Sequence, residues 1–280
     1  MTHTPQQLRE ILDRHGLEPR RRLGQNFVVD PNTVRRIAKL SGASPGDPIV
    51  EIGAGLGSLT LALAETGAEV TAVEIDGGLA LALRDVVADI ADTEVRVIEA
   101  DARTLDWEAL LAGRDGWQLV ANLPYNIATA LIVDLLSRVV ALESMLVMVQ
   151  REAGERLAAG PGDSAVGIPS LLVAYHGTAK VVGRVPATVF YPKPKVESVL
   201  VRIDRHAAPP VTQPLEVIEV LIRAGFNQRR KMLRRSLAGL VDSDGFANAG
   251  LDSRTRPETL SLADWSRLAS VADIPAAAPR

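Results

Sequence analysis

The chain has 280 residues, a formal net charge of -3 and an apolar fraction of 47%. This length is enough for one large core and a smaller second domain, and the apolar content excludes global disorder. The absence of cysteine excludes disulfides, thiolate metal ligands and cysteine nucleophiles, and fits a reducing compartment. The N-terminus has no apolar signal region and no apolar run is long enough to cross a bilayer. We therefore expect a cytoplasmic protein with neither a membrane nor a metal as partner.

Short apolar runs alternate with longer, helix-like segments between residues 48 and 204. The predicted strands cover residues 49–52, 70–74, 95–99, 119–122, 145–149, 179–185 and 196–203. The predicted helices between the early strands cover residues 59–65, 79–90 and 127–139. This alternation is typical of a parallel α/β sheet with helices on both faces. The last strands follow one another without long helices, which predicts antiparallel pairing at the far edge.

A proline-rich stretch over residues 205–214 lacks periodicity and is predicted to be a linker. After it the pattern is helical, and a helix from Gln228 onward would place Leu233, Leu237 and Leu240 on one buried face. The predicted organisation is a basic N-terminal segment (1–24), an α/β domain (25–204), the linker and a helical domain (215–280).

A glycine-rich turn follows the first predicted strand, with Gly53, Gly55 and Gly57 at alternate positions. Glycine there allows a sharp turn and a close approach of the backbone to a ligand. Glu74 ends the second strand, where a carboxylate can accept ribose hydroxyls, and Asp101 follows the third, where it can accept from an adenine amine. The spacing GxGxG, in place of the dinucleotide pattern GxGxxG, favours S-adenosylmethionine over NAD. A tight turn without any ligand is the structural alternative.

The residues Asn122, Leu123, Pro124 and Tyr125 follow the fourth strand, at the carboxyl edge where ligands of open α/β sheets bind. Proline restricts the residue before it to extended geometry, which can direct the Leu123 carbonyl into a pocket. That carbonyl and the Asn122 side-chain oxygen can each accept a hydrogen from an exocyclic aromatic amine. Such acceptors localise the nitrogen lone pair for methyl transfer, mainly by orientation and electrostatics. The alternative is a strand end followed by a proline turn.

With these motifs in place, the chain resembles the ribosomal RNA adenine dimethylases over nearly its whole length. The matching segments are residues 23–27 with Asp30, 51–57, 74–76, 101–102, 122–126, 149–152, 190–198 and 226–231. The resemblance implies a Rossmann-like class I methyltransferase domain, with a mostly parallel sheet and an antiparallel edge, and a small C-terminal helical domain. It also implies N6,N6-dimethylation of two adjacent adenosines near the 3′ end of small-subunit ribosomal RNA, in a 30S assembly intermediate. We expect a monomeric enzyme.

The resemblance further implies which residues hold S-adenosylmethionine, and the glycine turn adds one more. These residues are Asn26, Val28, Gly53, Gly55, Glu74, Asp101 and Asn122. The chain departs from the family pattern at Val28, where leucine is common, and at Ala54, where proline is common. We attribute both contacts to the backbone and expect neither departure to impair cofactor binding.

By the same resemblance, Tyr125 and Phe190 are predicted to stack on the two faces of the target adenine, as suits a base splayed out of its loop. An aromatic core anchor is the alternative for Phe190. Lys193 and Lys195 lie in a proline-rich segment and would contact phosphates or simply solvate a loop.

Two local clusters of cations stand out in a chain of negative net charge. The first is Arg20, Arg21 and Arg22, and the second is Arg223, Arg229, Arg230, Lys231, Arg234 and Arg235. The second cluster contains no acid, which favours contact with the RNA backbone over a solvated helix face. The first is predicted to serve the same end, with a flexible basic arm as the alternative.

Other functions remain open at this point. A large-subunit adenine methylase conferring macrolide-type resistance would share the chemistry, although isoleucine usually stands there in place of Leu123. An assembly or transcription factor would use the fold to bind nucleic acid without needing methylation. A nicotinamide dehydrogenase is the third alternative.

Overall fold

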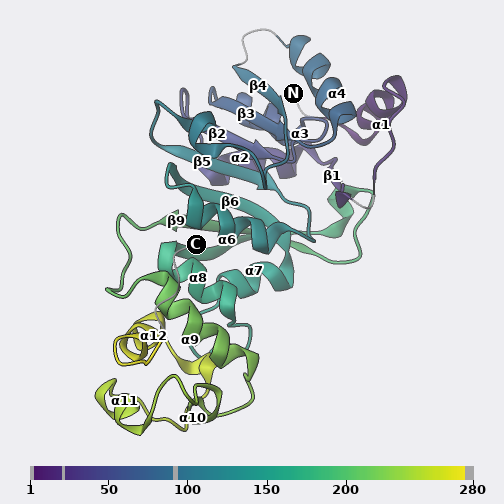
Figure 1. The fold of residues 1–280 in the computed structure, drawn as a ribbon. Helices are drawn as coiled ribbons and strands as arrows, with labels where there is room; N and C mark the ends of the chain where they lie inside the picture. Colours follow the sequence, from purple (N-terminus) through teal and green to yellow (C-terminus); the bar gives the residue numbers. More distant parts are fainter. Residues whose placement is uncertain (1–2, 21–22, 91–93, 275–280) are drawn as a thin grey trace. The chain divides into compact units, whose positions relative to one another are not determined.

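The computed structural model of this chain describes residues 3–20, 23–90 and 94–274 (Figure 1). The chain divides into two compact units. We call Met1–Gly154 with Lys180–Arg205 the sheet unit, and Glu155–Ala179 with His206–Arg280 the helical unit.

A seven-stranded sheet in the order β4-β3-β2-β5-β6-β9-β7 forms the centre of the sheet unit. The strands are β2 (Pro48–Ile52), β3 (Glu69–Glu74), β4 (Val95–Glu99), β5 (Trp117–Asn122), β6 (Leu142–Gln150), β7 (Gly177–Val185) and β9 (Ser198–Arg205). The pairs from β4 to β6 are parallel, whereas β9 runs antiparallel to β6. Residues 145–149 of β6 are all buried, which is the pattern of a strand covered on both faces. The predicted parallel sheet with an antiparallel edge is confirmed.

Six helices, the first turn of a seventh and a two-stranded ladder complete the sheet unit in its described part. The helices are α1 (Pro5–Arg14), α2 (Pro31–Ser41), α3 (Ser58–Ala64), α4 (Gly77–Ala88), α5 (Trp107–Leu111), α6 (Ala128–Arg138) and α7 (Arg151–Leu157). The ladder pairs β1 (Phe27–Val28) with β8 (Phe190–Tyr191), which follows the short 3-10 helix η2 (Ala187–Val189). Side chains of Thr4, Asp30, Asp76 and Asp106 cap α1, α2, α4 and α5, because each accepts from a free backbone N–H of the first turn.

The helical unit contains α8 (Ile168–His176), α9 (Leu215–Asn227), α10 (Leu233–Ser236), α11 (Ser243–Asn248), the 3-10 helix η3 (Pro257–Thr259) and α12 (Leu262–Ala269). Its core is centred on Trp265, which is fully buried among Ile218, Leu221 and Leu237. A Cβ at Gly225 of α9 would lie 2.6 Å from the Trp265 ring, so glycine lets this helix approach the indole. None of the helices in the described part of the chain combines the length and apolarity of a membrane span.

The structure corrects the predicted organisation at two places. Residues 155–179 belong to the helical unit because α8 packs on α9, with Leu171 in the core around Trp265. The N-terminal segment is not a separate basic arm, since Leu8 and Leu12 of α1 are buried with Leu56 and Leu79 of the sheet unit. Both results depend on contacts between segments that are far apart in the sequence.

The helix predicted from Gln228 onward is wrong. Helix α9 ends at Asn227, and α10 has only four residues. The backbone N–H groups of Leu233 and Arg234 donate to the carbonyls of Thr255 and Ser253, at 2.9 Å each, and not to a preceding helical turn. A neighbouring segment therefore replaces the helical hydrogen bonds of this region. Leu233 and Leu237 are nevertheless fully buried, as expected.

Candidate functional site

The glycine turn connects β2 to α3 with three residues in the left-handed region. Gly53, Gly55 and Gly57 have φ angles of 74°, 58° and 86°, which favour glycine strongly. Packing adds a second requirement, because a Cβ at Gly55 would lie 2.9 Å from the Phe27 ring and one at Gly57 only 2.5 Å from Leu83. The turn is therefore closely packed as well as tightly wound, and Gly53 and Gly55 line a pocket.

Glu74 ends β3 at the wall of this pocket and is buried, with 4% of its surface exposed. Its Oε2 accepts from the Gly55 N–H at 2.8 Å, and its Oε1 accepts from the Asp76 N–H at 2.9 Å. Burial raises the pKa of Glu74, and these two backbone hydrogen bonds oppose the rise. Each oxygen keeps a second lone pair, so the carboxylate can hold the glycine turn and still accept ligand hydroxyls.

Glu51 is a buried carboxyl of the pocket that the sequence analysis missed. It lies within β2, and its Oε2 accepts from the Thr60 hydroxyl at 2.6 Å. Burial raises the pKa of Glu51 to about 8, so the side chain is mostly protonated at neutral pH. An acid inside an apolar strand was the signal in the sequence, because such a group is rarely buried without a purpose.

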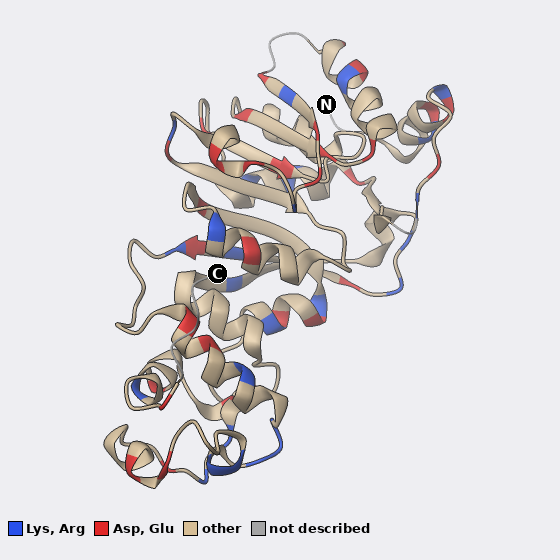
Figure 2. Cartoon of the chain, in the orientation of Figure 1, with Lys and Arg blue, Asp and Glu red and all other residues tan. Residues whose placement is uncertain are grey.

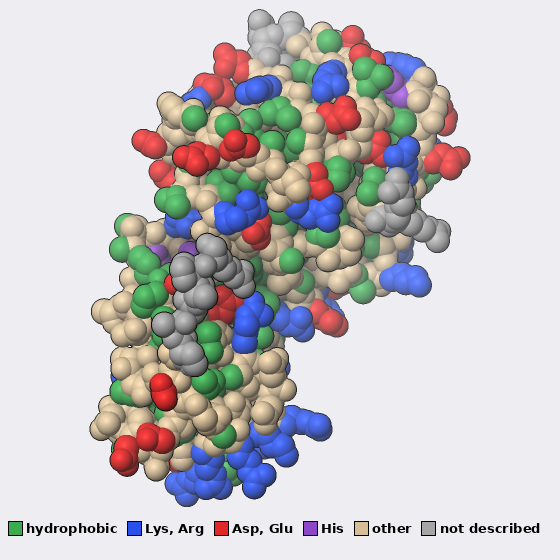
Figure 3. All heavy atoms as spheres, viewed as in Figure 1, with side chains coloured by type: hydrophobic (Ala, Val, Ile, Leu, Met, Phe, Trp, Pro, Cys, Tyr) green, Lys and Arg blue, Asp and Glu red, His purple; other side chains and the backbone are tan. Residues whose placement is uncertain are grey.

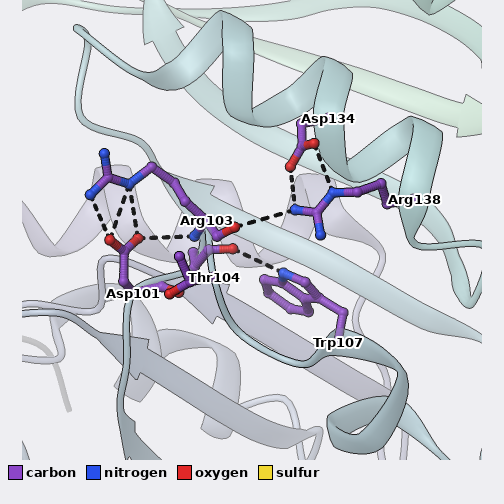
Figure 4. Close-up of polar contacts among 7 residues, drawn as sticks. Asp101, Arg103, Thr104, Trp107, Asp134 and Arg138 are labelled. Carbon is purple, nitrogen blue, oxygen red and sulfur yellow. Dashed lines mark hydrogen bonds and ion pairs between the residues drawn. The ribbon is translucent and has the colours of Figure 1, made fainter. Parts of the chain in front are cut away.

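Asp101 lines the pocket after β4, together with a residue that the sequence analysis also missed, Arg103. The Arg103 guanidinium binds both oxygens of Asp101, with Nε to Oδ1 at 3.0 Å and Nη2 to Oδ2 at 2.5 Å (Figure 4). These hydrogen bonds lower the pKa of Asp101. The spacing Asp-x-Arg after a strand was the available signal.

The tetrad begins at the end of β5, where Asn122 is tied to the N-terminal segment. The Asn122 Nδ2 donates to the Asn26 carbonyl at 2.9 Å, which leaves Oδ1 as the acceptor of this amide. The Leu123 N–H donates to Met148 of β6, while no donor in the described part of the chain pairs with the Leu123 carbonyl. Both acceptors that the methyl-transfer hypothesis requires are thus free of partners among the described residues. Asn122 and Pro124 line the pocket.

The aromatic residues predicted to stack on a base lie in different surroundings. Tyr125 is half-buried, and its hydroxyl is 2.7 Å from the hydroxyl of Ser198, the first residue of β9. Burial raises the pKa of Tyr125, so its hydroxyl stays neutral. Phe190 is only 4% exposed and packs in the sheet-unit core with Val28 and Leu200. In this structure Phe190 is a core anchor, as the alternative had it, and its stacking stays a prediction.

The N-terminal segment contributes more to the pocket than was predicted. Asn26 and Val28 line it as expected, and so do residues 23–25. Arg20, predicted to contact RNA, instead forms an ion pair with Asp76 at 2.9 Å. Asp76 also caps α4, so Arg20 secures the segment against the start of that helix. The other two members of the first basic cluster, Arg21 and Arg22, lie outside the described residues.

The second basic cluster is divided by its contacts. Arg223 pairs with Glu219 one helical turn away, and Arg229 donates to the Ser164 carbonyl at 2.7 Å. The other members are exposed and have no ion-pair partner among the described residues. They are Arg230, Lys231, Arg234 and Arg235, which we call the basic turn. Lys and Arg residues gather at α10 and the segment before it (Figure 2), and their side chains cluster on the surface of that end of the helical unit (Figure 3).

Lys193 and Lys195 are exposed in the segment between β8 and β9, so the structure leaves both predicted roles open to them. No group of three or more His, Asp or Glu side chains that could hold a metal ion occurs among the residues that the structure describes.

Known proteins are similar to this chain over nearly its whole length. The family model for ribosomal RNA adenine dimethylase matches residues 16–273. The chain is 45% identical over 275 residues to a ribosomal RNA small subunit methyltransferase A of Leifsonia xyli subsp. xyli, covering 95% of this chain and 97% of the relative. A protein of the same name from Thermobifida fusca is also 45% identical, over 95% of this chain and 94% of its own.

Two solved structures share the fold. The 23S rRNA methyltransferase ErmE is 25% identical with a TM-score of 0.69, over 89% of this chain and 100% of its own. A dimethyladenosine transferase from Plasmodium falciparum is 22% identical with a TM-score of 0.73, over 85% of this chain and 94% of its own. The family match spans the pocket, the tetrad and the basic turn, and the chain belongs to the ribosomal RNA adenine dimethylase family.

Proposed function

We propose that this enzyme transfers methyl groups from S-adenosylmethionine to the N6 atoms of two adjacent adenosines near the 3′ end of 16S ribosomal RNA. The observation that carries the proposal is the position of the tetrad. Asn122 and Pro124 form part of the same pocket wall as the glycine turn, Glu74 and Asp101. An acceptor for a target amine therefore lies beside the residues that suit a nucleoside cofactor. Family membership and the small-subunit relatives support the same assignment.

The residues of the pocket fit S-adenosylmethionine. Glu74 has lone pairs left for the two ribose hydroxyls, and Asp101 offers a carboxylate to the adenine amine. The left-handed glycines remove side chains from the turn, so its backbone can approach the ligand. When bound, the cofactor supplies an electrophilic methyl group on a sulfonium.

The chain's own contribution to the reaction is orientation. The Asn122 Oδ1 and the Leu123 carbonyl accept the two hydrogens of the target amine. These hydrogen bonds favour a pyramidal nitrogen whose lone pair is directed toward the methyl group to be transferred. The bond from Asn122 Nδ2 to Asn26 holds this amide in the required orientation. The hydrogen bond between the hydroxyls of Tyr125 and Ser198 restrains the phenol ring. No strong general base is needed, because the methylated amine loses its proton readily.

The large-subunit methylase remains the second candidate, because ErmE shares the fold over its whole length. Sequence identity favours the small-subunit activity, since it is 45% to the small-subunit relatives and 25% to ErmE. We propose that the enzyme acts as a monomer. The proposed substrate is a 30S assembly intermediate in the cytoplasm.

The test is transfer of tritiated methyl groups into 30S and 50S particles from cells lacking both activities, followed by nucleoside analysis. We expect N6,N6-dimethyladenosine in the 30S particles alone. Asn122→Ala is expected to reduce the single-turnover rate by roughly 10²–10³-fold, as for loss of one positioned polar group in a transition state. Label in 50S particles would favour the ErmE-like activity. Normal subunit maturation with Asn122→Ala would instead indicate an assembly factor.

A further inference from the structure

Arg103 binds the carboxylate of Asp101 with both its guanidinium and its backbone N–H. Its Nε lies 3.0 Å from Oδ1 and 3.1 Å from Oδ2, and its Nη2 lies 2.5 Å from Oδ2. The backbone N–H of Arg103 donates to Oδ1 as well, at 2.9 Å. Planar, multiple contacts of this kind define the orientation of a carboxylate more sharply than a single hydrogen bond does.

The loop that carries both residues is itself held by side chains from two helices. The Trp107 indole of α5 donates to the Ala102 carbonyl at 2.9 Å, and this bond is buried. The Arg138 Nη2, at the end of α6, lies 3.5 Å from the Arg103 carbonyl, and Arg138 is held in turn by Asp134 (Figure 4). The backbone of the loop and the side chains of Asp101 and Arg103 are therefore all restrained by hydrogen bonds. Helix α6 begins at Ala128, shortly after the tetrad, so the helix that carries Arg138 is also close to the tetrad in sequence.

Asp101 keeps the capacity to bind a ligand. A carboxylate offers about four lone-pair sites, and Arg103 leaves part of them free. The Asp101 side chain remains 24% exposed, and both residues line the pocket. We infer that Arg103 is a positioning residue that fixes Asp101 as an acceptor for the exocyclic amine of the cofactor, and so selects adenine over bases with a carbonyl there. This inference rests on the proposed function, because it assigns the cofactor's adenine to Asp101.

A second Asp-x-Arg pair provides a matched control. In the helical unit, Arg254 binds both oxygens of Asp252, with Nε to Oδ1 at 3.1 Å and Nη2 to Oδ2 at 3.1 Å. Its backbone N–H also donates to Oδ1, at 2.8 Å. The spacing and the contacts are the same, but neither residue lines the cofactor pocket. Arg254→Ala therefore removes an equivalent ion pair without touching the proposed site.

The experiment compares two ligands by calorimetry: S-adenosylhomocysteine, and S-inosylhomocysteine, in which a carbonyl replaces the exocyclic amine. The wild type is expected to bind the adenosyl ligand more tightly. In Arg103→Ala this preference should fall by about tenfold, the size of one weakened charge-assisted hydrogen bond, with the inosyl affinity nearly unchanged. Arg254→Ala should keep the wild-type preference, and Arg103→Lys should restore part of it.

A merely structural role for Arg103 would lower both affinities equally, and this result would overturn the inference. An unchanged preference in Arg103→Ala would overturn it as well. Asp101→Asn supplies an independent check, because an amide can donate to the inosyl carbonyl and should reverse the preference. If the wild type bound neither ligand, the proposed function itself would fail. The Arg103 side chain is 60% exposed, so its truncation leaves the core intact.

Discussion

In the cofactor pocket, each of the three acidic side chains of the wall has a donor from this chain, whereas the four cations of the basic turn have no ion-pair partner among the described residues. The donor is the Thr60 hydroxyl for Glu51 and the Arg103 guanidinium for Asp101, whereas Glu74 accepts from two backbone N–H groups. A small ligand has its hydrogen-bond donors at defined positions, so it is selected by protein acceptors that are held in one orientation. A polyanion is bound by positive charge that is left available.

The cofactor pocket and the basic turn also differ in the secondary structure that carries them. The pocket lies at the ends of buried parallel strands, whereas the basic turn lies in the segment after α9 and in α10, a helix of four residues. Its exposed cations nevertheless have fixed anchors, because Leu233 is fully buried and its N–H is bound to Thr255. The basic turn thus presents exposed cationic side chains from an anchored backbone, which suits contact with phosphates.

The largest effect is expected from Glu74→Gln. Both oxygens of Glu74 accept from backbone N–H groups, so a glutamine must point its NH2 at one of these donors. Cofactor affinity is expected to fall by about a hundredfold, and stability by about 1–3 kcal/mol for an unsatisfied buried donor. Glu51→Gln is the control, because a single hydroxyl donor faces its carboxyl and the amide oxygen can accept that bond. Calorimetry with S-adenosylhomocysteine measures the affinities. Equal losses in both variants would show that pairing is not what distinguishes these acids.

The next effect concerns the basic turn. The double variant Arg234→Ala, Arg235→Ala is expected to weaken RNA binding about tenfold at moderate salt, and to reduce the slope of log affinity against log salt by about 2. Arg223→Ala with Arg114→Ala removes the same charge from cations that are already paired with Glu219 and Glu69. This control is expected to change binding little. Filter binding to unmethylated 30S particles over a salt series measures both. Equal losses would mean that net charge matters and the turn does not.

The last effect, which leaves ligand binding aside, is a dependence of stability on pH. Burial raises the pKa of Glu51 from its ordinary value of 4.5 to about 8. The folded state therefore binds this proton more tightly, and the associated stability is present below pH 4.5 and lost as the pH rises through 8. We expect the Tm of the wild type to fall between pH 5 and 8.5 more steeply than that of Glu51→Gln. Glu74, whose pKa is also raised, leaves a residual slope of the same sign. Parallel Tm profiles would contradict a protonated Glu51.

Local patterns were sufficient for much of the fold and part of the site. The alternation of short apolar runs and amphipathic segments predicted the parallel strands, since burial on both faces selects continuous apolar runs. The glycine turn was predictable because the left-handed φ angles of Gly53, Gly55 and Gly57 exclude most other residues. The tetrad was placed correctly at the end of β5 for the same local reason, a strand followed by proline.

Contacts between distant segments decided the rest. Arg20 turned out to bind Asp76, Phe190 to be buried beside Val28, and residues 155–179 to pack with α9. Such contacts leave no periodic pattern in the sequence. An arginine or a phenylalanine has the same local propensity whether its side chain faces solvent, a ligand or another part of the chain.

The sequence by itself thus determined which elements form and which residue types stand at the strand ends, through steric limits on the backbone and the period of apolar burial. The tertiary structure alone decided which charges are paired. A cation close to a carboxylate loses much of its attraction for other anions, and only the folded chain brings Arg103 to Asp101 while leaving Arg234 and Arg235 without an ion-pair partner among the described residues.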